Sequence, residues 1–76
     1  MLKVADVLNL NLFDKLKIVE DVYITSLDGN KTLKFNKSDI VYFYKFVADK
    51  EGCYLTIITE SGQKIECSLE NVELLK

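Results

Sequence analysis

The chain has 76 residues, 49% of them apolar and 29% charged, a composition that excludes a disordered or low-complexity protein. We expect a single domain over residues 1–76, of a size at which small domains often add a staple, a metal or a partner subunit. The net charge of −2 is uneven, because residues 30–50 carry five Lys against two Asp (+3), whereas residues 1–29 and 51–76 carry −2 and −3.

Neither a membrane span nor a secretory signal is indicated. No apolar run approaches the ~20 residues that a membrane-spanning helix needs. Near the N-terminus, Asp6 and Asn9 interrupt what would have to be the apolar region of a signal peptide. We therefore expect a cytoplasmic protein with reduced thiols and no contact with a membrane.

The first 17 residues are predicted to be a helical segment. Residues 3–9 have apolar side chains at helical spacing, and Asn11 is placed to cap a second helical turn from Leu12 to Lys17. The apolar side chains of this segment are expected to cover one mouth or face of a sheet. They are Val4, Val7, Leu8, Leu12, Phe13 and Leu16.

From residue 18 onward the pattern has a period of two, which predicts a β meander over residues 18–76. The segments 22–26 and 31–35 flank a turn at Asp28-Gly29, which favours a two-residue hairpin loop. That loop would pair Ile24 with Leu33 and Val22 with Phe35, so that apolar side chains meet on one face of the hairpin.

A second hairpin repeats this pattern with a longer loop. A three-residue loop from Glu60 to Gly62, with Gly62 in a left-handed conformation, would pair Ile57 with Ile65. The same register pairs Leu55 with Cys67 and Cys53 with Leu69. It separates the two cysteines by about 7–8 Å, too far for an easy disulfide.

The two hairpins belong to an internal pseudo-repeat with a spacing of 32 residues. Corresponding positions carry related residue types and are followed by a further apolar segment in each case. The pairs are Leu33 and Ile65, Phe35 and Cys67, Asp39 and Asn71, Ile40 and Val72, and Tyr42 and Leu74.

Between the hairpins, residues 40–47 are apolar on both faces except at Lys45. Such a strand is either buried on both sides or presents an aromatic face to a partner. A turn at 69–71 precedes a short final strand at 72–75, which could alternatively extend a helical turn from Ser68. The predicted fold class is α+β and mostly β, with a short N-terminal helix packed on a bent antiparallel meander of five to six strands, as a small SH3-like or Sm-like barrel.

The sequence offers little for catalysis or metal binding. The chain has no His, the most common general base, and we expect no catalytic residue and no enzymatic activity. Cys53 and Cys67 lie fourteen residues apart without a second Cys or His pair, so neither a metal site nor a cofactor is expected. Both cysteines are expected to be buried small apolar side chains. The carboxylates at 66, 70 and 73 are expected to form a solvated face.

The basic and aromatic middle of the chain supplies the candidate partner-binding residues. If Tyr42 and Tyr44 face the core, Phe43 and Lys45 share the opposite face of their strand. Lys31 falls on the apolar face of its own strand. The residues proposed for partner contact are Lys34, Lys37, Phe43 and Lys45.

Two functions fit this pattern. The first is a small non-catalytic interaction or regulatory module that binds another protein or assembles with itself. The alternative is a nucleic-acid-binding transcriptional or RNA regulator, because single-strand binders combine stacking aromatic rings with basic side chains. The absence of Arg disfavours sequence-specific DNA readout.

Parts of the sequence resemble three known protein families. The segments 39–43, 54–59 and 62–65, followed by Leu69, resemble the strand pattern of LytTR-type DNA-binding domains over about residues 35–75. This resemblance implies transcriptional regulation but assigns no DNA-contacting residue, since the positions for those contacts would lie beyond Lys76. Residues 4–10, followed by 17–19, are similar to the opening of the sensory domain of PucR-type purine-catabolism regulators. The layout of a helix followed by about five strands is similar to that of Sm-like RNA-binding rings.

Overall fold

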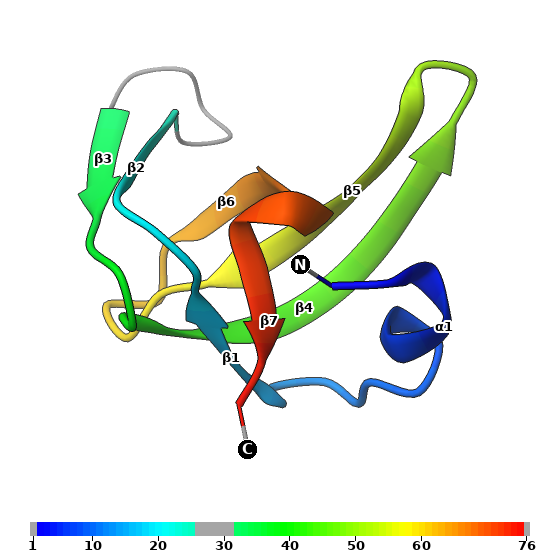
Figure 1. Ribbon diagram of the computed structural model, residues 1–76, viewed down its shortest axis with the longest axis horizontal. Coiled ribbons are helices and arrows are strands. Elements are labelled where there is room, and N and C mark those ends of the chain that lie inside the picture. The colour runs from blue at the N-terminus through cyan, green and yellow to red at the C-terminus, as the bar shows by residue number, and fades with distance from the viewer. Residues whose placement is uncertain (1, 26–31, 76) are drawn as a thin grey trace.

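The computed structural model describes residues 2–25 and 32–75 (Figure 1). Its strands form a five-stranded antiparallel sheet in the order β6-β5-β4-β1-β7 and a separate two-stranded sheet, β2-β3. The described residues are therefore mostly β, with one short N-terminal α-helix, as the sequence predicts. The elements are α1 (Val4–Val7), β1 (Lys15–Ile18), β2 (Val22–Thr25), β3 (Thr32–Phe35), β4 (Ile40–Asp49), β5 (Gly52–Ile58), β6 (Lys64–Ser68), the 3₁₀ turn η1 (Leu69–Asn71) and β7 (Val72–Leu74).

The N-terminal segment is anchored at two points rather than along a continuous apolar stripe. Leu2 and Val7 are buried, and the Leu2 N–H donates a hydrogen bond of 3.0 Å to the Leu69 carbonyl. The expectation that the whole apolar set covers the sheet is wrong, because only Val7 and Leu16 of that set are buried. The exposed members are Val4, Leu8, Leu12 and Phe13.

The predicted second helical turn, Leu12 to Lys17, is also wrong. Asn11 and Asp14 form a single tight turn, in which the Asp14 carboxylate accepts the Asn11 N–H at 2.8 Å. Strand β1 then begins at Lys15 and lies between β4 and β7, paired to both. Two rows of backbone hydrogen bonds outweigh the local helical preference, so the helical segment ends well before residue 17 and the strands begin before residue 18.

Both predicted hairpin registers are confirmed. In the first hairpin, Ile24 pairs with Leu33 and Val22 with Phe35. The loop at 28–29 and Lys31 lie outside the described residues. In the second, Ile57 pairs with Ile65. The loop between Thr59 and Gln63 has the expected three residues, and Gly62 is left-handed with φ +88°.

The cysteines differ from each other in burial. Leu55 pairs with Cys67 as predicted, and Cys67 is buried. Cys53 instead lies next to the β4–β5 turn and is exposed, so the expectation of two buried cysteines is wrong for it. The pairing of β5 with β6 begins at Tyr54 and Ser68 and does not reach Cys53.

The pseudo-repeat appears in the structure as the same turn used twice. The Asp39 carboxylate accepts the N–H of Asn36 at 2.8 Å, and 32 residues later the Asn71 side chain accepts the N–H of Ser68 at 3.2 Å. Each turn leads into a strand that pairs with β1, because Ile40 and Val72 begin β4 and β7. The repeat therefore places β4 and β7 on the two sides of β1.

Strand β4 is the longest strand and forms one wall of the core (Figure 1). Its register with β5 shifts between Phe43 and Lys45, a β-bulge that leaves Tyr44 without a paired residue. Phe43 is only 8% exposed, so the expectation that it lies opposite the core is wrong. It belongs to the apolar core listed here: Leu2, Val7, Leu16, Ile18, Ile24, Phe35, Val41, Phe43, Leu55, Ile57, Ile65, Cys67, Leu69 and Val72.

Candidate functional site

The face of the five-stranded sheet that points away from the core, here called the outer face, carries a row of paired side chains. Lys15 pairs with Tyr42, Tyr42 with Ile58, and Ile58 with Lys64. Paired residues point to the same side of a sheet, and their neighbours Leu16, Val41 and Ile57 fill the core. The outer face thus has two half-buried apolar groups between two exposed lysines.

Tyr44 extends this row at the bulge. Lys64 Nζ lies 3.3 Å from the Tyr44 hydroxyl, to which it donates a hydrogen bond, and 4.4 Å from the centre of the Tyr44 ring. A lysine over an aromatic face is attracted by the ring quadrupole. The bulge therefore directs Tyr44 to the outer face, where the ammonium group of Lys64 contacts its ring and its hydroxyl. Lys45, next along β4, is exposed and pairs with Thr56.

Phe13 borders the outer face in an unusual conformation. Its φ is +69°, a region that bulky residues other than glycine rarely occupy, and its side chain is 57% exposed. Two backbone hydrogen bonds hold it against β4. The Phe13 N–H donates to the Phe43 carbonyl at 2.7 Å, and the Phe43 N–H donates to the Asp14 carbonyl at 2.9 Å. The chain thus holds an aromatic ring at the surface in a conformation that costs energy.

Phe13, Tyr42 and Ile58 together line an open groove of about 710 Å³, here called the aromatic groove. Its remaining lining residues come from the loop that follows β5. They are Thr59, Glu60 and Gly62. The groove is therefore mostly apolar, with a carboxylate at one end and the lysines of the outer face around it.

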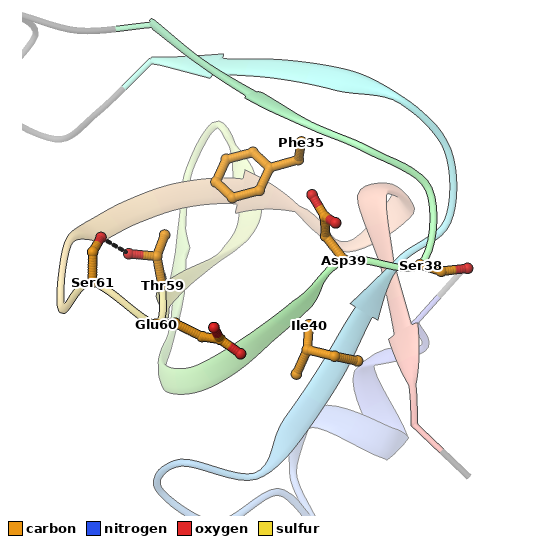
Figure 2. Close-up of a pocket in the computed structure, with 7 residues that line it drawn as sticks. All are labelled: Phe35, Ser38, Asp39, Ile40, Thr59, Glu60 and Ser61. Atoms are coloured by element: carbon orange, nitrogen blue, oxygen red, sulfur yellow. Dashed lines mark hydrogen bonds between the residues drawn. The ribbon is translucent and has the colours of Figure 1, made fainter.

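A second depression, here called the acidic crevice, shares Thr59 and Glu60 with the aromatic groove and has a volume of about 440 Å³. Its lining residues come from the end of β3, the link between β3 and β4, the start of β4 and the loop after β5. They are Phe35, Ser38, Asp39, Ile40, Thr59, Glu60 and Ser61 (Figure 2). The loop is held in shape by a 2.8 Å hydrogen bond between the hydroxyls of Thr59 and Ser61.

The structure brings only one of the predicted partner-binding residues to the outer face. Lys45 lies there, whereas Lys34 is exposed on β3, paired with Tyr23. Lys37 is exposed in the link between β3 and β4, where its backbone N–H donates to the Asp21 carboxylate at 2.8 Å. Phe43 is in the core. The four residues therefore do not form one surface.

Sequence reasoning missed Phe13, Lys15 and Lys64 as members of a surface. The signal for Lys15 was present, because residues 15–18 alternate Lys, Leu, Lys and Ile, a period of two. Phe13 gave no such signal, since a positive φ in a phenylalanine has no counterpart in composition or spacing. Its exposure depends on the pairing of β1 with β4, a contact between distant parts of the chain.

Both cysteines are free, and burial raises the pKa of the Cys67 thiol to about 12, which keeps it protonated. Within residues 2–25 and 32–75 no three His, Cys, Asp or Glu side chains are grouped to hold a metal ion. The same residues include no helix long and apolar enough to cross a membrane.

An ion pair between two half-buried residues of β1 and β7 also lies on the outer face. Lys17 Nζ lies 3.0 Å from a carboxylate oxygen of Glu73, across β1 and β7. The hydrogen bond from Lys17 holds the pKa of the Glu73 carboxyl below its ordinary value. Lys17 is therefore already paired within the chain.

Comparison of the chain with protein-family models, with curated proteins and with solved structures finds no match.

Proposed function

We propose that this chain is a non-catalytic interaction module that binds a protein partner through the aromatic groove on its outer face. The observation that carries the proposal is Phe13, a strained aromatic residue whose ring is exposed beside Tyr42 and Ile58. Strained backbone that persists at a surface is concentrated at binding and catalytic sites. We propose that the strain at Phe13 serves binding.

The composition of the groove fits a protein contact. Binding energy at protein interfaces is concentrated in a few aromatic and apolar side chains near the centre of the contact, with polar side chains around them. Phe13, Tyr42 and Ile58 would form such a centre, and Lys15 and Lys64 would form part of the rim. The partner is either another protein or a second copy of this chain.

The order of elements also supports an SH3-like barrel, which we propose as the finer description of the fold. A hairpin, β2–β3, is inserted between the first strand and a bent three-strand meander, and a 3₁₀ turn precedes the last strand. Strand β1 joins the meander to the last strand, and β2 lies beside β6. Nuclear Overhauser contacts between the side chains of β2 and β6 in solution would test this closure. Their absence would favour two separate sheets.

The experiment that tests the binding function compares two single substitutions of exposed aromatic residues. Phe13→Gly removes the ring from the groove, whereas Tyr23→Ser removes a 69% exposed ring from β2, outside it. The wild type and both variants are immobilised, and the proteins they retain from an extract of the source cell are compared. A retained protein is then purified and titrated calorimetrically against all three.

The proposal predicts that Phe13→Gly weakens binding of this partner by roughly 30-fold, the effect of a central interface residue worth about 2 kcal/mol. Tyr23→Ser should bind like the wild type. Equal affinity of the wild type and Phe13→Gly would contradict the proposal. If the chain retains only itself, light scattering will show whether the oligomer dissociates in Phe13→Gly.

Single-stranded nucleic acid is a second candidate ligand, because the outer face combines aromatic rings with Lys15, Lys45 and Lys64. Three phosphate contacts to a single strand predict an affinity that falls about 100-fold for a tenfold rise in salt. Anisotropy of labelled DNA and RNA oligonucleotides measures this, and no binding at low salt excludes the candidate.

A further inference from the structure

We infer that the partner segment is an extended peptide with an apolar side chain in the aromatic groove and a Lys or Arg side chain, a few residues along, in the acidic crevice. This inference rests on the proposed protein-binding function and adds the chemistry of the ligand. It is carried by the continuity of the two depressions and by the difference between their linings, since the aromatic groove is mostly apolar and the acidic crevice has two carboxylates.

The two depressions form one continuous strip. Thr59 and Glu60 line both of them, so the strip passes from one to the other at the end of β5. On the β4 side, Ile40 lines the acidic crevice and Tyr42 lines the aromatic groove. These two residues are two positions apart on one strand and therefore project to the same face. An extended chain has the same periodicity, so its alternate side chains can enter the two depressions.

The acidic end of the strip is set by two carboxylates from different elements. Asp39, in the turn before β4, is oriented by the hydrogen bond that its Oδ2 accepts from the Asn36 N–H at 2.8 Å. Glu60 comes from the β5–β6 loop on the other side of the crevice (Figure 2). Figure 2 also shows the Ser38 side chain pointing away from the other labelled residues, so the two carboxylates dominate the polar lining.

Charge complementarity indicates that the side chain entering the acidic crevice is basic. The described residues that line the acidic crevice include no lysine, whereas Lys15 and Lys64 lie at the two ends of the row through the aromatic groove. A basic side chain is attracted to the crevice and repelled from the lysines, which gives the bound segment a direction. Phosphate groups would be repelled from the same crevice, so nucleic acid is the disfavoured occupant of the full strip.

The test uses a phage-displayed library of random linear peptides, selected on the wild type and on Glu60→Lys. Glu60 is exposed in a loop, so the substitution changes the charge of the crevice without removing a core side chain. Glu70→Lys, which makes the same charge change at an exposed position in η1, is the control. The fold of each variant is verified by circular dichroism before selection.

The inference predicts that the wild type and Glu70→Lys enrich peptides with a basic residue near an apolar one. Glu60→Lys should bind such a peptide at least about tenfold more weakly and should instead enrich an acidic residue at that position. Enrichment without a basic residue, in peptides that lose binding to Phe13→Gly, would overturn this inference and leave the proposed function standing. Peptides that bind Phe13→Gly as well as the wild type, or no enrichment at all, would overturn both.

Discussion

At position 13 we predict that a glycine variant is more stable than an alanine variant, the reverse of the usual order. In an ordinary strand or helix interior, glycine is less stable than alanine by about 0.5–1 kcal/mol, because the flexible unfolded chain loses more entropy on folding. At a φ of +69° the order should reverse, since a left-handed conformation costs a residue with a Cβ about 1–2 kcal/mol and costs glycine nothing.

The magnitudes follow from the exposure of the ring. Phe13 is 57% exposed, so about two-fifths of a full Phe burial, roughly 1 kcal/mol, is lost in either variant. Phe13→Ala keeps the backbone strain and should lose about 1 kcal/mol of unfolding free energy. Phe13→Gly relieves the strain at an entropic cost of about 0.5–1 kcal/mol and should be close to the wild type. The glycine variant should therefore be about 0.5–1 kcal/mol more stable than the alanine variant.

The assay is urea denaturation followed by circular dichroism, together with thermal unfolding, in which the glycine variant should melt roughly 3–6 °C above the alanine variant. Leu12 offers the matched control, because it is 55% exposed and its φ is not positive, so Leu12→Ala should be more stable than Leu12→Gly. If Phe13→Ala is the more stable of the Phe13 pair, the backbone at this residue is not left-handed and the argument from strain is refuted.

Three further predictions concern the core, the thiols and the ion pair. Phe43→Ala should lower the free energy of unfolding by about 3–5 kcal/mol, measured by urea denaturation, because Phe43 is buried. A loss below about 1 kcal/mol would show that Phe43 is not a core residue. Iodoacetamide should add one adduct to the folded chain, at the exposed Cys53, and a second at Cys67 only after unfolding; mass spectrometry that finds rapid modification of both in the folded state would contradict the structure. The lowered pKa of Glu73 means that its pair with Lys17 stabilises the fold above the ordinary value of 4.5 and that this contribution is lost as pH falls through the lower folded value. Glu73→Gln should therefore differ most from the wild type at neutral pH and converge with it in acid, and a stability difference that is constant with pH would show that the pair contributes nothing.

Local chemistry made much of the fold predictable. The register of the second hairpin follows from Gly62, whose φ of +88° fits the three-residue loop, and from the match of Ile57 with Ile65. The 32-residue repeat could also be read from the sequence, and the turn before β7 has the same side-chain contact as the turn before β4. These features depend on residues close together in the chain.

The parts that could not be predicted depend on contacts between distant segments. Lys15–Ile18 is a strand because β4 and β7 supply partners on both sides, and no local preference contains that information. The bulge at Tyr44 shifts the alternation of β4, which is why Phe43 lies in the core although Lys45 is exposed. The candidate site was missed for the same reasons, since Phe13 reaches it through the pairing of β1 with β4.

The measurement that tests the central claim most directly is the change in backbone amide shifts of the ¹⁵N-labelled chain on titration with a purified partner or a selected peptide. The account predicts that the largest changes fall on residues that line the aromatic groove, with Phe13, Tyr42 and Ile58 among them. It also predicts that Tyr23 and its neighbours on β2 stay unchanged. Changes confined to the β2–β3 hairpin, with the groove unaffected, would contradict the assignment of the outer face as the binding surface.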